Sequence, residues 1–153
     1  MLTRGLRVGL AAANRGDYDL QFLGYAPDVE VHTDHPGWLA IDVDPVYHGT
    51  DGLRCLFDIL KGGFAELRWE PREVLDAGGG RFACRLDFVG VGRGSGIEAR
   101  QEAWHVVVVE RGLVVRQHVL STEEEALAAL TQAASNAPRS GAMSGSTSPT
   151  ASG

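Results

Sequence analysis

The chain has 153 residues, of which 44% are hydrophobic and 22% are charged, a balance typical of a folded globular protein and not of a fibrous or wholly disordered one. At this length we expect one domain, and about two thirds of the surface of the unfolded chain can be buried. The formal net charge of -6 argues against a nucleic-acid-binding protein, because such proteins carry a basic face.

No stretch reaches the roughly 18 consecutive apolar residues that a membrane span needs, and the N-terminus lacks the pattern of a signal peptide. We therefore expect a cytoplasmic protein that binds neither membranes nor nucleic acids. Its two cysteines, Cys55 and Cys84, are not spaced as metal ligands, and they are expected to be buried free thiols and not a disulfide.

The first third of the chain predicts two helices and one strand. Apolar residues recur at spacings of three and four through residues 2–14, which is the period of a helix, and a polar, glycine-containing turn follows. Asp17 can cap a second short helix that runs to about Tyr25. Residues 29–33 alternate as in a strand, and residues 34–46 form a long loop of the kind that often covers a functional site.

The centre of the chain predicts a third helix followed by four strands. Residues 52–61 place apolar side chains on one stripe, after a turn that supplies a cap and before a pair of glycines. From Ala65 to Ser121 the pattern is that of strands. Three short breaks divide this region into four runs, at residues 77–80, 90–96 and 110–112. Breaks of this length join antiparallel neighbours.

The end of the chain predicts a last helix and a tail. A capping-box sequence beginning at Ser121 opens a helix with Leu127 and Leu130 on its apolar side. Residues 134–153 contain no aromatic residue, Ile, Leu or Val, so they cannot bury enough surface to offset the entropy of ordering. We therefore divide the chain into a folded domain, residues 1–133, and a disordered Ser/Gly/Ala-rich tail, residues 134–153.

Together these elements indicate an α+β domain in which a curved antiparallel sheet has helices packed on its concave face. A strongly bent sheet that is closed on one side by helices forms a cone, and alternate strand residues line the interior of the cone. The inward-facing strand residues are therefore the place to look for a site.

Six segments, in order and with matching gaps, resemble the SnoaL-like proteins of the nuclear transport factor 2-like superfamily. They are NRGD (14–17), PDVEVH (27–32), YHGTDGL (47–53), GSG (94–96), AWHV (103–106) with ERG (110–112), and EEAL (124–127). The resemblance covers roughly residues 6–130. It implies a conical cavity that relatives use for polyketide cyclisation, steroid isomerisation, dehydration or epoxide opening, and that others use only for binding. It also implies a homodimer through the outer face of the sheet.

Comparison with the ketosteroid isomerase branch tests one particular chemistry. The position of that branch's first-helix Tyr falls on Gly9, the position of its general-base Asp falls on Thr33, and the position of its second Asp falls on about His105. Two of the three acid–base groups are thus absent and the third is replaced. The sequence therefore argues against steroid isomerisation by that mechanism.

Alternation orients the strand over residues 99–109. Gln101 and His105 share one face of this strand and Trp104 lies on the other, and the register of the resemblance makes the first face the wall of the cavity. His105 is then an inward imidazole among apolar neighbours, able to take or give a proton near neutral pH. The alternative is a histidine that is hydrogen-bonded within the core.

A partner for His105 is expected on the last strand, and two registers are open. A two-residue turn at residues 111–112 sets His118 opposite His105, whereas a bulged turn sets Gln117 there, because a slip of one residue exchanges the faces. The resemblance favours Gln117 inside the cone and His118 outside.

Five further residues are candidates at the mouth and wall of the cone. Thr33 and Asp34 follow each other at the mouth end of a strand. Asp34 can become a general base with a raised pKa if Trp38 and the surrounding loop desolvate it, and otherwise it is a solvated loop carboxylate. Tyr47 either presents its hydroxyl to the cavity or anchors a turn. Trp69 fills the cone or packs beneath the helices.

Two other patterns do not predict binding sites. The Asp and His residues between positions 34 and 48 are of metal-ligand types, but their spacing follows no ligand motif. Residues 92–96 have the glycines of a phosphate loop, yet they connect two strands and not a strand to a helix. Because neither pattern matches a binding motif, we expect no metal and no cofactor. The side chain of His32 is expected to point away from the cavity.

These observations predict a small-molecule-binding protein whose cone holds an apolar, polyketide-like or ring-containing ligand. A cofactor-free cyclase, dehydratase or isomerase reaction would use acid–base chemistry centred on His105, assisted by Gln117 or Gln101 and by Asp34. The expected substrate-binding residues are Thr33, Trp38, Tyr47, Trp69 and Gln101. The alternative is a non-catalytic ligand-binding or dimeric assembly module in which His105 is structural.

Overall fold

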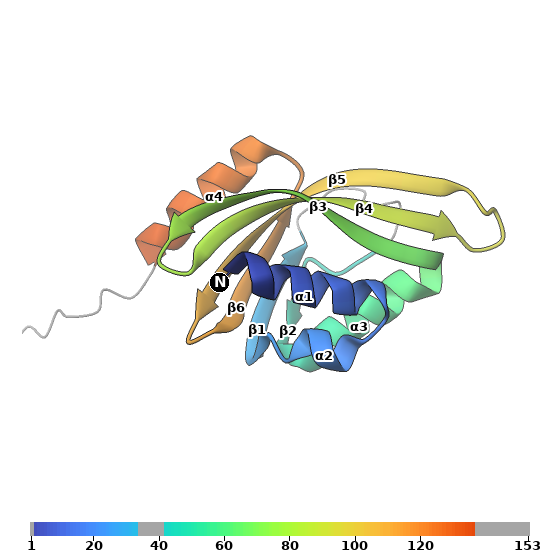
Figure 1. Ribbon diagram of the computed structural model, residues 1–153, viewed down its shortest axis with the longest axis horizontal. Helices are drawn as coiled ribbons and strands as arrows, with labels where there is room; N and C mark the ends of the chain where they lie inside the picture. Colours follow the sequence, from blue (N-terminus) through green and yellow to red (C-terminus); the bar gives the residue numbers. More distant parts are fainter. Residues whose placement is uncertain (1, 34–41, 137–153) are drawn as a thin grey trace, which may run out of the picture.

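The computed structural model describes residues 2–33 and 42–136, which form four helices and six strands (Figure 1). In chain order these are α1 (Leu2–Asn14), α2 (Tyr18–Phe22), β1 (Tyr25–Thr33), β2 (Val46–His48), α3 (Gly49–Gly63), β3 (Phe64–Gly78), β4 (Arg81–Gly92), β5 (Glu98–Glu110), β6 (Leu113–Leu120) and α4 (Glu123–Asn136).

Most elements begin and end close to where the sequence predicts them. α1 coincides with the predicted helix, and Asp17 caps α2 as expected, because its side chain accepts a hydrogen bond of 3.2 Å from the backbone nitrogen of Leu20. The predicted extension of α2 to Tyr25 is wrong, since Tyr25 already begins β1. β2 is not predicted, because three residues are too few to show a period.

The six strands form one mixed sheet in the order β2-β1-β6-β5-β4-β3. Strands β3 to β6 are joined by short turns and pair antiparallel, as predicted. β1 instead runs parallel to β6, with Val31 opposite Gln117 and Thr33 opposite Val119. Parallel neighbours need a long crossover connection, here the whole segment from β2 to β5. Local turn signals therefore could not predict this pair.

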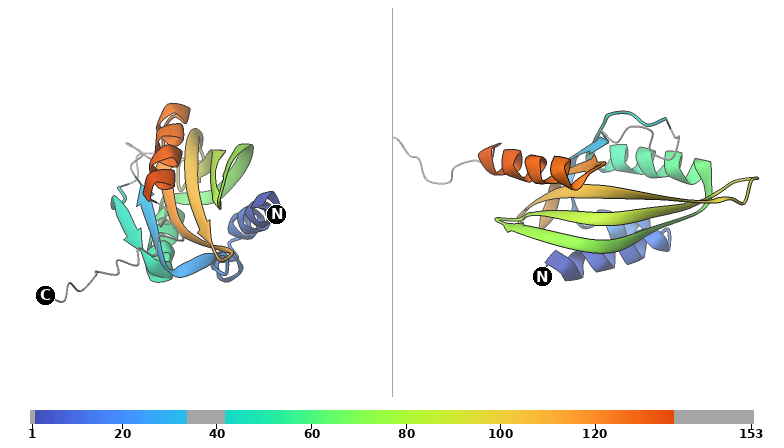
Figure 2. Two further views of the ribbon diagram at one scale, coloured as in Figure 1. Left: turned by 90° about the vertical axis from the view of Figure 1, so that its left-hand side faces the viewer. Right: turned by 90° about the horizontal axis from the view of Figure 1, so that it is seen from above.

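Three helices cover the concave face of the sheet. Figures 1 and 2 show β3, β4 and β5 curving over α1, α2 and α3. Aromatic side chains fill the narrow part between the layers, where the ring centroid of Trp69 lies 5.4 Å from that of Phe88 and 5.6 Å from that of Phe57. The predicted α+β fold, with a curved sheet and helices on its concave face, is confirmed.

The fourth helix lies on the opposite, convex face. α4 packs on β4 and β5, where Trp104 and Val106 join Ala126 and Leu130 in a second buried cluster (Figure 1). The sequence places Trp104 and Val106 on an outward apolar stripe, and a helix of the same chain removes that stripe from water. α4 continues to Asn136, so the first residues assigned to the tail are helical.

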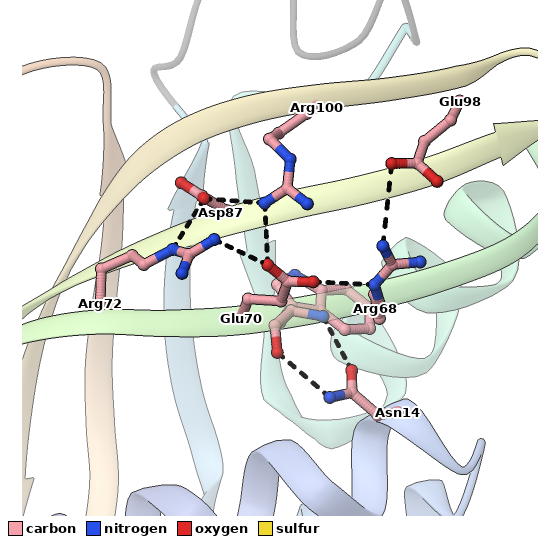
Figure 3. Close-up of polar contacts among 8 residues, drawn as sticks. Asn14, Arg68, Glu70, Arg72, Asp87, Glu98 and Arg100 are labelled. Carbon is pink, nitrogen blue, oxygen red and sulfur yellow. Dashed lines mark hydrogen bonds and ion pairs between the residues drawn. The ribbon is translucent and has the colours of Figure 1, made fainter.

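Charged side chains of β3, β4 and β5 form ion pairs with one another on the convex face of the sheet (Figure 3). Glu70 accepts hydrogen bonds from Arg100 at 2.8 Å and Arg72 at 2.9 Å, and Asp87 accepts from the same two arginines at 2.9 and 2.8 Å. Hydrogen bonds from Arg100 and Arg68 lower the pKa of Glu70 to about 2. The convex face of these strands therefore carries a network of ion pairs between alternating positive and negative side chains.

The end of α1 is tied to β3, the edge strand of the sheet. Nδ2 of Asn14 donates to the backbone oxygen of Trp69 at 3.1 Å, and Oδ1 of Asn14 accepts from the backbone nitrogen of Trp69 at 2.8 Å (Figure 3). An edge strand leaves such groups unpaired, and an amide side chain can satisfy a donor and an acceptor at once. The two bonds fix the C-terminal end of α1 beneath the sheet.

Two sequence predictions fall on residues that the structure does not describe. Asp34 and Trp38 belong to the segment 34–41, and the greater part of the predicted tail follows Asn136. In the part of the chain that the structure does describe, no helix is both long and apolar enough to cross a membrane.

Candidate functional site

A cavity of about 390 Å³ lies between the concave face of the sheet and the three helices beneath it. Most of its wall is apolar, and no Asp, Glu, Lys or Arg occurs among the lining residues described. The lining residues are Gly5, Leu6, Gly9, Leu10, Ala13, Gln21, Gly24, Tyr25, Val31, Leu53, Leu56, Phe57, Leu60, Trp69, Phe82, Cys84, Leu86, His105, Val107, Val109, Gly112, Val114, Gln117 and Val119. A space of this size suits a small organic molecule.

Two glycines of α1 keep part of this space open. Gly5 and Gly9 are about one helical turn apart, so they lie on the same face of the helix, and both line the cavity. A Cβ atom built on either glycine would meet nothing within 4 Å. Larger residues here would extend into the cavity, so the glycines leave room that side chains would otherwise fill.

Four polar side chains lie in the otherwise apolar wall: Gln21 of α2, Tyr25 of β1, His105 of β5 and Gln117 of β6. The hydroxyl of Tyr25 donates to Oε1 of Gln117 at 3.1 Å, and Nε2 of Gln117 lies 2.9 Å from Nδ1 of His105. The side chain of Gln21 interacts with Tyr25 and lowers the pKa of that hydroxyl. Tyr25, Gln117 and His105 therefore form one continuous series of hydrogen bonds.

The direction of this chain fixes the proton on the imidazole of His105. Because the hydroxyl of Tyr25 donates to Oε1 of Gln117, the amide nitrogen of Gln117 faces His105. An amide NH₂ group can only donate, so Nδ1 of His105 accepts this hydrogen bond. The neutral ring then carries its proton on Nε2, and His105 is a hydrogen-bond donor through that atom.

Tyr25 keeps its proton at neutral pH. Burial raises the pKa of Tyr25 to about 12, and the hydrogen bond from Gln21 opposes this rise only in part. A neutral hydroxyl can donate to Gln117, whereas a phenolate cannot. The hydrogen bond from Tyr25 to Gln117 is therefore kept over the whole physiological range of pH.

Gln21 leaves one polar atom unsatisfied. The residue is 8% exposed, and its Oε1 has no hydrogen-bond partner within the described structure. A buried polar atom without a partner costs about 1–3 kcal/mol, so such atoms are rare in folded proteins. This oxygen belongs to a residue of the cavity wall.

The register of the last hairpin differs from both predicted alternatives. The turn at residues 111–112 is tight, with Glu110 opposite Leu113, but β6 holds one extra residue between Val114 and Arg116. Val119 therefore lies opposite His105, and the expectation of Gln117 or His118 at that position is wrong.

Gln117 nevertheless reaches His105, because it lies opposite Val107 on the cavity face and its long side chain spans the diagonal. His118 lies on the convex face, where its ring centroid is 5.2 Å from that of His32. His32 also contacts Glu30, its neighbour on the same outer face. The outward direction expected for His32 agrees with this contact.

Cys84 lies directly opposite His105 on β4, and both residues line the cavity. Burial raises the pKa of the Cys84 thiol to about 12. The thiol, and not the nucleophilic thiolate, is then present at neutral pH. The pair is therefore not a cysteine–histidine nucleophile, and Cys84 acts as a small apolar part of the wall.

Two of the expected substrate-binding residues form hydrogen bonds outside the cavity. The hydroxyl of Thr33 donates to the backbone oxygen of Asp44, and the hydroxyl of Tyr47 accepts a hydrogen bond of 2.9 Å from the backbone nitrogen of Asp44. Both residues are buried, and neither lines the cavity. Tyr47 thus anchors the approach to β2, which is the second of the two roles considered for it.

The other candidates divide between the wall and its surroundings. Trp69 lines the cavity, whereas Gln101 is not a lining residue, although it lies on β5 opposite Phe88. Asp34 and Trp38 lie outside the described residues. Within residues 2–33 and 42–136, no group of three or more His, Cys, Asp or Glu side chains is placed to hold a metal ion.

Sequence reasoning missed Gln21 and Tyr25. The local pattern puts Tyr25 at the end of a helix, whereas the structure makes it the first residue of β1, beside β6. Its partner Gln117 is 92 positions away along the chain. No local signal connects two such residues, because the parallel pairing of β1 with β6 brings them together.

No protein-family model matches the sequence, and no curated protein matches it either. Solved structures match over most of the chain. TerC co-crystallised with polyporic acid is 18% identical, with a TM-score of 0.68 over 85% of this chain and 97% of that chain. A protein of unknown function from Burkholderia pseudomallei, described as NTF2-like, is 22% identical, with a TM-score of 0.68 over 84% of this chain and 96% of that chain.

A third structure is RV0760c from Mycobacterium tuberculosis in complex with estradiol-17beta-hemisuccinate. It is 13% identical, with a TM-score of 0.66 over 80% of this chain and 94% of that chain. Likenesses at these identities show a shared fold and not a shared activity. The chain has the nuclear transport factor 2-like fold that the sequence resemblance predicts.

Proposed function

We propose that the protein binds an apolar, ring-containing small molecule in the cavity and acts on it by cofactor-free acid–base chemistry, as a cyclase, dehydratase or isomerase. The observation that carries the proposal is the chain of hydrogen bonds from Tyr25 through Gln117 to His105 inside an apolar wall. A chain of this kind holds one imidazole in a single orientation and tautomer, as a proton-transfer or polarising group requires.

In this proposal His105 is the central catalytic residue. The imidazole of His105, which lines the cavity, donates a hydrogen bond to a carbonyl or hydroxyl oxygen of the substrate, which stabilises negative charge that develops on that oxygen in an apolar surrounding. Gln117 is a positioning residue, since it occupies Nδ1 and orients the ring. Asp34 is the proposed base that removes a proton from the adjacent carbon, an assignment that rests on the sequence.

The neighbours support small-molecule binding as the general role. Two of the three solved structures described above hold a ring-containing organic molecule, polyporic acid in one and an estradiol ester in the other. The cavity of this chain has a volume suited to ligands of that class and an apolar wall of aromatic and aliphatic residues.

Proton exchange on a model ketone tests the chemistry without knowledge of the natural substrate. With 2-tetralone in D₂O, we expect the wild-type protein to accelerate exchange of the protons next to the carbonyl on the order of 100-fold over buffer, as followed by NMR. His105→Gln and Asp34→Asn should each remove most of this acceleration. His118→Gln, on the convex face of the sheet, is the matched control and should retain it.

If His105→Gln accelerates proton exchange on 2-tetralone as much as wild type does, the proposed catalytic role of His105 is wrong. If 2-tetralone binds in the cavity and the wild-type protein does not accelerate exchange, the protein is a non-catalytic binding module. One observation favours this second function: none of the lining residues described is an Asp or Glu, so this part of the wall offers no carboxylate base.

We further propose a homodimer through the convex face of the sheet, in a cytoplasmic protein. α4 covers the apolar stripe at Trp104 and Val106, so the network of ion pairs around Glu70 and Arg100 remains as the surface for a partner chain. Light scattering of the purified protein measures the oligomeric state. A dimer that separates into monomers at high salt fits this surface, because salt screens ion pairs between exposed groups.

A further inference from the structure

The side of α1 that faces away from the cavity carries a row of exposed arginines. α1 turns Gly5, Gly9 and Leu10 towards the cavity, so its opposite side is left to the solvent. Figure 2 shows α1 at the edge of the molecule. Residues three, four, seven and eleven positions apart share one side of a helix. The exposed residues with this spacing, here called the outer face of α1, are Arg4, Arg7, Val8, Ala11 and Arg15.

The arginines of the outer face of α1 differ from those of the sheet in having no carboxylate beside them. On the convex face of the sheet, Arg68, Arg72 and Arg100 all pair with Glu70. None of the ion pairs in the described structure includes an arginine of the outer face of α1. α1 itself contains no Asp or Glu that could pair with an arginine one turn away. The outer face of α1 is therefore a positive patch on a chain whose formal net charge is -6.

This placement of charge weakens α1 as a helix. The N-terminus of a helix carries a partial positive charge and is stabilised by acidic residues. The first turn of α1 instead contains Arg4 and no acidic residue. The two glycines that line the cavity weaken the helix further, because glycine has a low helix propensity. Negative charge supplied from outside the chain should therefore stabilise α1.

We infer that the outer face of α1 is a docking surface for an acidic segment of a partner protein. Arg4 and Arg15 lie 11 positions apart, which is about 16 Å along a helix and matches about five residues of an extended segment. Each guanidinium can bind a carboxylate through two parallel hydrogen bonds. The inference concerns a surface outside the cavity, so it does not depend on the proposed function.

Two other anionic partners fit this surface less well. An amphipathic helix binds a membrane through a row of large apolar side chains, whereas Val8 is the one large apolar side chain on the outer face of α1. A nucleic acid presents a long run of phosphates, and three arginines would neutralise only a few of them on a chain of net negative charge. A short acidic segment needs no more positive charge than the outer face of α1 offers.

Binding of a labelled hexaglutamate tests the inference. In about 20 mM NaCl, the fluorescence anisotropy of fluorescein-labelled hexaglutamate should rise on titration with the wild-type protein, and about 200 mM NaCl should suppress the rise. Hexaglutamine with the same label should not bind, which excludes binding through the dye. Replacing Arg4, Arg7 and Arg15 together by Gln should weaken binding about tenfold. Hydrogen exchange of the α1 amides should slow when hexaglutamate is bound.

The matched control replaces Arg54, Arg93 and Arg116 by Gln. These exposed arginines lie on α3, in the turn after β4 and on β6, so the control removes the same charge from scattered positions. It should keep the wild-type affinity for hexaglutamate within about twofold. Equal losses in the two triple variants would overturn the inference, because binding would then follow net charge and not the outer face of α1.

The inference is also overturned if the wild-type protein does not bind hexaglutamate, or if it prefers phosphatidylserine vesicles or an oligodeoxythymidylate. If the variant of α1 does not fold, hydrogen exchange of wild-type α1 with and without hexaglutamate still decides the question, and unchanged exchange in α1 contradicts the inference. Binding of 2-tetralone in the cavity tests the proposed function separately.

Discussion

Nε2 of Gln117 on β6 lies 2.9 Å from Nδ1 of His105 on β5, and the two residues are diagonal neighbours and not direct partners in the sheet. Their contact depends on the extra residue in β6, because that residue sets Gln117 opposite Val107. The neighbouring hydroxyl of Tyr25 completes the arrangement from β1. Three strands therefore determine the orientation of a single imidazole.

Replacing Gln117 by Leu tests how much this arrangement stabilises the fold. The change removes both hydrogen bonds and leaves the hydroxyl of Tyr25 and Nδ1 of His105 without this partner. We expect the free energy of unfolding in urea to fall by about 1–3 kcal/mol. Gln132→Leu, the same change at an exposed position on α4, should stay within about 0.5 kcal/mol of wild type. Equal losses in the two variants would contradict the prediction.

At the junction of α1 and β3, the stability of Asn14 variants should depend on how many of the two hydrogen bonds to Trp69 each variant keeps. Asn14→Ala removes both bonds to the backbone of Trp69 and should lower the free energy of unfolding by about 2 kcal/mol. Asn14→Asp keeps an acceptor for the backbone nitrogen of Trp69 and loses the donor, so it should fall between Ala and wild type. Hydrogen exchange of the Trp69 amide should be faster in Asn14→Ala and unchanged in a remote variant such as Gln132→Leu.

Replacing the glycines of α1 should stabilise the fold and, where the new side chain is large, reduce the space for a ligand. Gly5→Ala and Gly9→Ala meet no atoms and improve helix propensity, so each should raise the free energy of unfolding by about 0.5–1 kcal/mol. Gly9→Leu should fill part of the cavity and weaken the binding of 2-tetralone. Gly16→Ala is the control with the opposite sign, because Gly16 has φ +74° and an alanine there is strained.

Tyr25 predicts a loss of stability at alkaline pH. Its pKa is raised to about 12 in the folded protein, above the value near 10 of an unfolded chain. The stability linked to this difference is fully present below pH 10 and is lost as the pH rises towards 12, by about 2–3 kcal/mol in all.

Tyr25→Phe separates this effect from that of Cys84, whose raised pKa acts in an overlapping range. The variant should be less stable than wild type at pH 7, because Oε1 of Gln117 loses its donor. Its free energy of unfolding should then fall less steeply than that of wild type between pH 10 and 12. Parallel curves for the two proteins in denaturant titrations would refute this account of Tyr25.

Glu70 predicts the corresponding loss at acid pH. Hydrogen bonds from Arg100 and Arg68 lower its pKa to about 2, so its contribution is present at neutral pH and is lost as the pH falls from about 4.5 towards 2. The stability of Glu70→Gln should depend less on pH in this range, and less on added salt, than the stability of wild type. Glu66→Gln, at an exposed position on the same strand, is the control. Thermal unfolding at pH 7 and pH 3 measures both effects.

Local sequence signals were sufficient for most elements of the fold. The helix of residues 2–14, the Asp17 cap, the four consecutive strands and the closing helix each follow from spacing, capping and turn residues, which act between neighbours in the chain. Simple alternation also separates the two faces of β5, and the family resemblance indicates which of them faces the cavity, so the sequence could nominate His105 as a residue of the cavity wall.

The partners of His105 were decided only by the tertiary structure. The extra residue in β6 changes which side chains face each other, and the parallel pairing of β1 with β6 brings in Tyr25. Both features depend on contacts between residues far apart in the chain, whose free energy comes from burial in the assembled core and not from local preference. The sequence alone therefore determined the wall on which His105 lies, and the packed sheet decided which groups hold its ring.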